Sequence, residues 1–114
     1  MKIIAFLLVV SLPLFGAEPK VVSFDKLQHR GWLSYIPNQD TPFTGKAVSF
    51  YANGQKRHEA NYKDGKLDWA NDWYENGQKD TESNWKDGNW VVVIYNDDGA
   101  EVDRQTWMDG KLID

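Results

Sequence analysis

The chain contains no cysteine, and this absence excludes several kinds of site. Without thiols there is no disulfide framework, no thiolate nucleophile and no zinc–thiolate centre. Lipid attachment at a mature N-terminal cysteine is excluded for the same reason. Small exported domains often depend on disulfides, so a domain of this size must be held together by other contacts.

Basic residues are also few. The 114 residues include 13 Lys and Arg against 17 Asp and Glu, which gives a net charge of −4. Proteins that bind nucleic acid need clustered Lys and Arg to neutralise phosphates, and docking to anionic lipid needs a polybasic segment. The composition therefore predicts no nucleic-acid partner.

Only one long apolar run is present, residues 3–15, which follows Lys2 and precedes a small-residue pair ending at Ala17. This layout is typical of a secretory signal peptide. A membrane-spanning helix needs about 20 apolar residues, whereas this run is shorter and interrupted by Ser11 and Pro13. We predict a signal peptide over residues 1–17, cleaved near Ala17, and export to the periplasm, cell envelope or medium. An uncleaved anchor and a buried N-terminal strand are the alternatives.

Turn signals recur along the rest of the chain. Between them lie proline-free segments rich in Val, Ile, Thr and aromatic residues, at 46–52, 56–63, 67–74, 79–86, 90–95 and 101–108. Asn-Gly and Asp-Gly pairs are strong hairpin signals, because Gly adopts positive φ without steric cost and Asn or Asp tolerates the neighbouring turn conformation. The six pairs, 11 or 12 residues apart, are Asn53-Gly54, Asp64-Gly65, Asn76-Gly77, Asp87-Gly88, Asp98-Gly99 and Asp109-Gly110.

These signals predict an all-β protein, an antiparallel β-meander of stacked hairpin repeats in a single-layer or shallowly curved sheet. We expect three repeats, at 46–68, 69–90 and 91–114. Before them we expect an extended lead-in over 18–26 and a capping hairpin over 27–45, with strands at Trp32–Ile36 and from Phe43, because a terminal unit must protect an exposed edge. The 23-residue interval from Gly54 to Gly77 is odd, so keeping side chains on one face requires a bulge or a three-residue connection with left-handed Gly.

Aromatic residues repeat with the turns. Phe50, Trp73 and Tyr95 precede the turns at one rim, and Tyr62, Trp85 and Trp107 precede the turns at the other. One interpretation is structural, with cross-strand aromatic contacts stabilising a thin sheet. The other is that part of a row is a binding surface. The predicted binding surface consists of Phe50, Tyr51, Trp73, Tyr74 and Tyr95.

Catalytic patterns are absent from the sequence. The two histidines are His29 and His58, and the acid adjacent to His58, Glu59, would lie on the opposite face of a strand. His58 is therefore interpreted as a strand residue, with a chemical role as the lesser alternative. The acidic stretch at residues 95–103 is interpreted as turn chemistry, with weak calcium binding as the alternative. We predict no enzyme activity, no cofactor and no metal site.

The strings "FYANGQKRHEANYKDGKLD", "WYENGQKD" and "YNDDGAEVDRQTWMDGKLI" resemble the MORN-variant repeat. Bacterial proteins that carry it are commonly described as toxin–antitoxin system YwqK family antitoxins. The resemblance extends over residues 27–114. It implies a sheet of stacked hairpins and a binding activity without catalysis.

Three functions follow as hypotheses. The first is a protein-binding module that uses the predicted aromatic surface, with a toxin as partner if the antitoxin resemblance extends to function. The second is a structural scaffold of the cell envelope without a partner. The third is association with lipid or glycan through the aromatic rings. We expect the first, because repeat proteins present extended surfaces for recognition.

Overall fold

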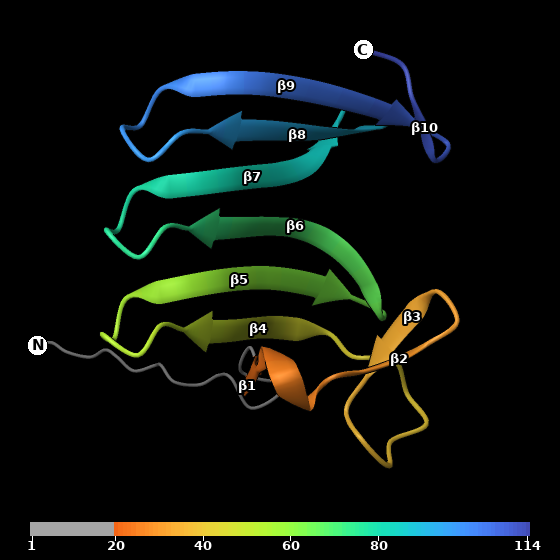
Figure 1. Ribbon diagram of the computed structural model, residues 1–114. Helices are drawn as coiled ribbons and strands as arrows, with labels where there is room; N and C mark the ends of the chain where they lie inside the picture. The colour runs from red at the N-terminus through yellow and green to blue at the C-terminus, as the bar shows by residue number, and fades with distance from the viewer. Residues whose placement is uncertain (1–19) are drawn as a thin grey trace, which may run out of the picture.

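The computed structural model describes residues 20–114, so the predicted signal peptide and the first two residues of the lead-in lie outside the described part. Ten strands and one short 3₁₀ helix form the fold, and eight of the strands make one sheet in the order β1-β4-β5-β6-β7-β8-β9-β10 (Figure 1). The elements are β1 (Val21–Ser23), η2 (Phe24–Lys26), β2 (Gln28–Arg30), β3 (Leu33–Tyr35), β4 (Gly45–Phe50), β5 (Lys56–Lys63), β6 (Lys66–Trp73), β7 (Lys79–Lys86), β8 (Asn89–Tyr95), β9 (Glu101–Met108) and β10 (Lys111–Leu112).

The predicted all-β antiparallel meander is confirmed. From β4 to β10 each strand pairs with the next one in sequence, and every pairing is antiparallel. The long strands of the repeats begin and end within one or two residues of their predicted bounds. This agreement reflects turn chemistry that is encoded locally in each hairpin.

The turns are of two kinds, one at each end of the sheet. At one end, Asp64, Asp87 and Asp109 and the glycine after each have positive φ, as a two-residue type I′ turn requires. At the other end the connection has three residues. There Gly54 N–H donates to the Tyr51 carbonyl and Tyr51 N–H donates to the Gln55 carbonyl, with Gly54 at φ +89. This is the predicted three-residue connection with left-handed Gly.

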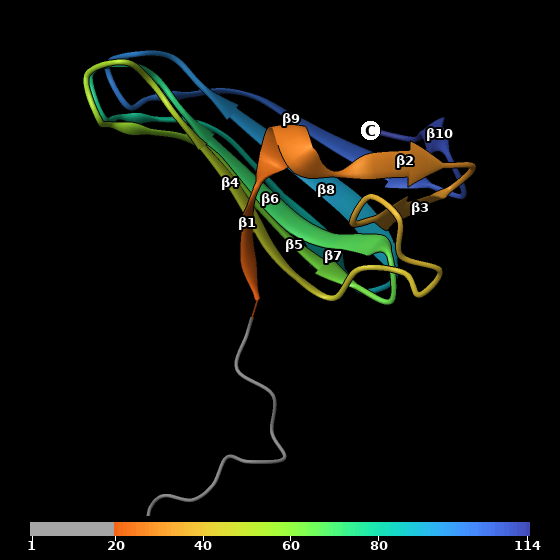
Figure 2. The same cartoon turned by 90° about the horizontal axis from the view of Figure 1, so that it is seen from below.

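The two faces of the sheet differ. Strand register places Ala47, Ala60 and Ala70 in one cross-strand row, and Ala47 and Ala60 are fully buried. We call this the covered face, because the segment from η2 to β3 lies over it (Figure 2). Small side chains in that row let the segment approach closely. The other side is called the opposite face.

The hydrophobic core occupies only part of the covered face. Leu27 and Phe43 from the N-terminal segment pack with Tyr62 and the alanine row, and Val22, Phe24 and Ile36 pack around them. All of this packing lies over β4, β5 and β6. Among the described residues, this core does not extend to β7, β8 or β9.

The N-terminal region corrects two expectations. The lead-in is not wholly extended, because residues 24–26 form η2, and β1 pairs in parallel with β4. It is therefore β1 that protects the first edge of the sheet. The predicted capping hairpin does form a hairpin, but from β2 and β3, as a separate two-stranded sheet. Its turn lies at Gly31 (φ +65) and Trp32, because Gly at the first turn position favours a two-residue hairpin.

Candidate functional site

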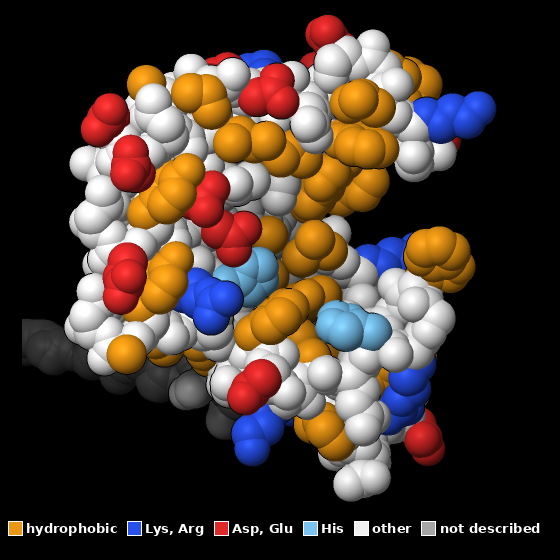
Figure 3. All heavy atoms as spheres, in the orientation of Figure 1, with side chains coloured by type: hydrophobic (Ala, Val, Ile, Leu, Met, Phe, Trp, Pro, Cys, Tyr) orange, Lys and Arg blue, Asp and Glu red, His pale blue; other side chains and the backbone are white. Residues whose placement is uncertain are grey.

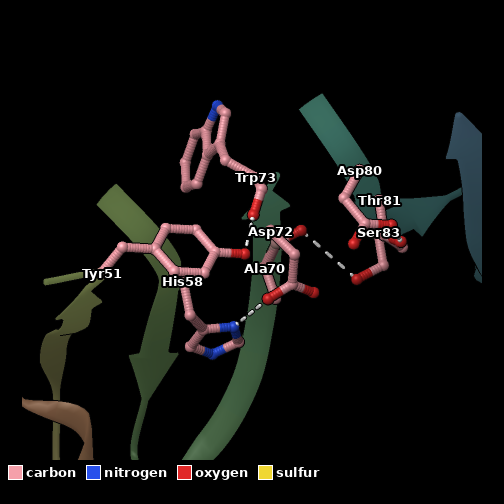
Figure 4. A network of polar contacts seen from close by, with 8 residues as sticks. All are labelled: Tyr51, His58, Ala70, Asp72, Trp73, Asp80, Thr81 and Ser83. Carbon is pink, nitrogen blue, oxygen red and sulfur yellow. Dashed lines mark hydrogen bonds and ion pairs between the residues drawn. The ribbon is translucent and has the colours of Figure 1, made fainter. Parts of the chain in front are cut away.

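Two of the five predicted binding residues act as links between successive hairpins. The Tyr51 hydroxyl donates a hydrogen bond of 2.7 Å to the main-chain carbonyl of Trp73 (Figure 4). The Tyr74 hydroxyl donates one of 2.7 Å to the carbonyl of Tyr95. Each tyrosine thus joins the loop of one hairpin to the last strand residue before the next loop. These hydroxyl groups already have a structural partner.

Asparagines of the same loops add a second link. Asn53 Nδ2 donates to the Glu75 carbonyl at 3.2 Å and Asn76 Nδ2 donates to the Asp97 carbonyl at 3.1 Å. The Oδ1 atom of each asparagine accepts the N–H of the glutamine two residues later at 2.9 Å. The recurring sequence Tyr-x-Asn-Gly-Gln is therefore explained by contacts within a loop and between neighbouring loops.

The other three predicted residues, Phe50, Trp73 and Tyr95, lie on the opposite face among charged side chains. Lys56 Nζ lies 5.5 Å from the centre of the Trp73 ring and 3.4 Å from Glu59 Oε2. The Tyr95 hydroxyl donates to Glu82 Oε1 at 2.7 Å. Phe50 remains 56% exposed. The structure does not bring these rings into a common pocket.

Hydrogen bonding shifts two pKa values on this face. The Tyr95 hydroxyl and the Lys79 ammonium group, which is 3.0 Å from Glu82 Oε2, hold the pKa of Glu82 below its usual range. The same hydrogen bond to a carboxylate raises the pKa of Tyr95. Glu82 is therefore stabilised in its charged form, paired with Lys79 and Tyr95 on this face.

His58 has an acidic partner that its sequence neighbours do not reveal. Asp72 lies opposite His58 in the β5–β6 register, and Nδ1 of the ring lies 2.5 Å from Asp72 Oδ1 (Figure 4). The Phe24 ring packs edge-on against the imidazole with centroids 4.6 Å apart. Ser49 lies across from His58 on β4, yet no hydrogen bond joins the two within residues 20–114. The pair therefore lies where Phe24 of η2 packs on the sheet.

Metal binding finds no support in the described residues. Across residues 20–114 no three His, Cys, Asp or Glu side chains are grouped as metal ligands. In the acidic stretch, Asn96 Oδ1 accepts the N–H groups of Asp98 and Ala100 at 3.0 Å. That arrangement is turn chemistry, which was the favoured interpretation of this stretch.

A further aromatic cluster lies on the covered face beyond the core. Strand register places Trp85, Trp90 and Trp107 side by side on β7, β8 and β9. The Trp85 and Trp90 rings meet at an interplanar angle of 65° with centroids 5.1 Å apart. Trp85 Nε1–H donates to the Leu67 carbonyl at 3.3 Å, which fixes the ring while leaving the side chain 54% exposed.

A fourth tryptophan faces this cluster from the N-terminal hairpin. Trp32, at the tip of β2–β3, is 95% exposed and lines a hollow of about 300 Å³ together with Lys66, Leu67, Trp85 and Trp90. Two further hollows, of about 320 and 300 Å³, adjoin it and share Trp85. We call the surface formed by Trp32, Leu67, Trp85, Trp90 and Trp107 the tryptophan groove. Figure 3 shows hydrophobic side chains gathered around an indentation at the right-hand margin.

The sequence pattern identified part of this groove. Trp85 and Trp107 were predicted as one aromatic row with Tyr62, but Tyr62 is buried in the core and neither tryptophan was assigned to the binding surface. The position of Trp90 could have been predicted from the sequence, because Trp85 and Trp90 lie symmetrically on either side of the Asp87-Gly88 turn and must pair across it. Trp32 had no such signal, since its position depends on how the hairpin packs.

Comparison with known proteins gives no match. No family model matches the chain, and no curated protein and no solved structure matches it. The resemblance to MORN-variant repeats and to YwqK family antitoxins therefore stays a prediction. Among the described residues, no helix is long and apolar enough to span a membrane.

Proposed function

We propose that this chain is a non-enzymatic, exported binding module whose ligand-binding surface is the tryptophan groove. One observation carries the proposal: tryptophans from β7, β8, β9 and the β2–β3 hairpin line two open hollows that share Trp85 and Trp90, and Trp32 and Trp85 are more than half exposed. Monomeric proteins rarely expose contiguous apolar patches unless the patches bind something.

The groove is favoured over the surface predicted from the sequence. The tyrosine hydroxyls of the predicted surface donate to neighbouring hairpins, and its Trp73 ring lies beside a paired lysine. By contrast, Trp85 is fixed through its indole nitrogen and by the Trp90 ring, and more than half of its surface stays exposed. Rigid tryptophans of this kind are typical energetic centres of recognition surfaces.

Affinity capture tests the proposal. Mature Glu18–Asp114 is used as bait for envelope and culture fractions of the source cells, beside Trp85→Ala and the matched control Trp73→Ala. We expect a ligand that is retained by wild type and Trp73→Ala and lost by Trp85→Ala, while all three chains melt cooperatively. Loss of folding in Trp85→Ala with no ligand in wild type would contradict the proposal and favour the scaffold hypothesis.

The sequence predicts that the ligand is a protein, and the family resemblance implies that this protein is a toxin. Both stay predictions. The capture experiment addresses them directly, because a stoichiometric protein in the wild-type eluate would be identified by mass spectrometry.

A further inference from the structure

We infer that the ligand of the tryptophan groove is an uncharged carbohydrate chain, bound by stacking of sugar rings on Trp85, Trp90 and Trp32. This inference rests on the proposed function and names its ligand class. A pyranose ring has an apolar face of C–H groups and a rim of hydroxyl groups. Its recognition therefore needs flat aromatic surface with hydrogen-bonding groups close to that surface.

The rings of the groove meet the first requirement. Trp85, Trp90 and Trp107 occupy consecutive strands in one cross-strand row, and Trp32 lines one hollow together with Trp85 and Trp90. The face of an aromatic ring carries partial negative charge, which attracts the weakly positive C–H groups of a sugar. Each hollow has a volume of about 300 Å³, at the lower limit for small-ligand sites, and a chain can cross several of them in succession.

Polar side chains meet the second requirement. Lys63, Asp64, Lys66 and Asp68 line the hollow on the β5–β6 side of Trp85, and Asp109 lines the hollow beside Trp107. Carboxylates accept hydrogen bonds from hydroxyl groups and ammonium groups donate to hydroxyl oxygens. These charged groups flank the row of tryptophan rings at its two ends.

The charge of the groove indicates that the ligand is neutral. Its hollows are lined by two lysines and three aspartates, so neither sign dominates. A polyanion or an anionic membrane would need a basic surface, and a polycation would need an acidic one. A neutral glycan requires neither.

The main chain beside the groove disfavours an extended peptide. Peptides in extended conformation usually add a strand to an exposed sheet edge. Next to Trp107 that edge is already occupied, because Thr106 N–H donates to the Asp114 carbonyl and Ile113 N–H donates to the Thr106 carbonyl. The backbone of a peptide in the groove would face side chains alone, whereas a glycan has no peptide backbone that must be paired.

Titration with defined glycans tests the inference. Intrinsic tryptophan fluorescence of mature Glu18–Asp114 is recorded with cellohexaose and chitohexaose, and pelleting is measured with insoluble glucan, chitin and phosphatidylcholine vesicles. Four chains are compared: wild type, Trp85→Ala, Trp85→Phe and the opposite-face control Trp73→Ala. We expect binding of at least one glycan, weakened about tenfold or more by Trp85→Ala, partly restored by Trp85→Phe and unchanged by Trp73→Ala.

The other outcomes separate this inference from the proposed function. If no glycan binds but a protein is captured in a Trp85-dependent manner, the carbohydrate inference is overturned and the binding function stands. Pelleting only with phosphatidylcholine vesicles likewise overturns the carbohydrate inference. Loss of glycan binding in Trp73→Ala but not in Trp85→Ala refutes the groove. If neither glycan, vesicle nor protein binds wild type, both proposals fail.

Discussion

Removal of one hydroxyl group tests whether the loop tyrosines hold the repeats together. In Tyr74→Phe the ring remains, but the hydrogen bond of 2.7 Å to the Tyr95 carbonyl is lost. The net contribution of a hydrogen bond to stability is modest, because water pairs with both groups in the unfolded chain. For a domain of this size, loss of one such bond lowers the melting temperature by about 4–8 °C.

The assay is urea denaturation followed by far-ultraviolet circular dichroism, with thermal melting as a second measure. Tyr51→Phe, which loses the equivalent bond to the Trp73 carbonyl, should show a similar loss. Tyr35→Phe is the matched control, because within residues 20–114 its hydroxyl makes no hydrogen bond and its ring packs under Arg30. The double variant should depart from the sum of the two single effects, because the acceptor of Tyr51 is the carbonyl of Trp73, which is bonded directly to Tyr74, and neighbouring sites couple.

Equal stability of wild type, Tyr74→Phe and Tyr51→Phe would refute the reasoning. It would mean that the hydroxyl groups bond equally well to water and that the recurrence of tyrosine serves another purpose. A loss in Tyr35→Phe as large as in the loop variants would also contradict it, because the effect would then follow from the ring and not from the link.

Three further predictions concern stability and burial. Gly65→Ala and Gly88→Ala start from the same φ of +83, but a Cβ at Gly65 would lie 2.8 Å from Pro42 Cβ, whereas at Gly88 nothing lies within 4 Å. Gly65→Ala should therefore cost about 1–3 kcal/mol more in urea denaturation, and equal costs would contradict the packing of the N-terminal segment. The folded-state pKa of Glu82 is lowered, so the stability that Glu82 contributes is present above the unfolded-state pKa and is lost as pH falls through the lower folded-state value. Tyr95→Phe should reduce this loss of stability at acid pH, measured as melting temperature against pH. An unchanged profile would count against the hydrogen bond from Tyr95 to Glu82. Ala60→Leu should lower the free energy of unfolding by about 1–3 kcal/mol, because Ala60 is fully buried under the N-terminal segment and overpacking strains a core. An unchanged melting temperature would show that the segment does not pack tightly on Ala60.

The sequence was sufficient for the features that depend on neighbours in the chain. Asn53-Gly54 and Asp64-Gly65 each specify a turn within a few residues, and the alternating pattern between them specifies a strand. The odd interval from Gly54 to Gly77 predicted a bulge or a three-residue connection, and the structure has both, the connection at Gly54 and a register shift between Asn61 and Tyr62. Local turn chemistry therefore accounts for the meander.

Contacts between distant segments could not be predicted in the same way. Three β1 residues, Val21–Ser23, pair in parallel with β4 more than twenty positions away, and so short a strand carries no periodicity to identify it. His58 and Asp72 are 14 residues apart, and their meeting depends on the register shift between Asn61 and Tyr62. A slip of one residue would have moved Asp72 to the other face.

The candidate site shows the same division. Repetition drew attention to Tyr51 and Tyr74, yet their repetition comes from links between hairpins. Trp32 occurs outside the repeats, and its place beside Trp85 and Trp90 follows from the packing of β2–β3 over the sheet. The repeated tyrosines link the hairpins, whereas the groove combines a row of repeated tryptophans with Trp32, which does not repeat.

The most direct test measures stability and ligand binding together in Trp73→Ala and Trp85→Ala. Both variants remove a tryptophan from neighbouring strands of one sheet, but Trp73 packs beside the paired Lys56 on the opposite face, while Trp85 opens onto the groove. The account predicts that Trp73→Ala lowers the urea midpoint with binding per folded molecule unchanged, and that Trp85→Ala abolishes binding in a chain that still unfolds cooperatively. Binding lost in Trp73→Ala and kept in Trp85→Ala would contradict it.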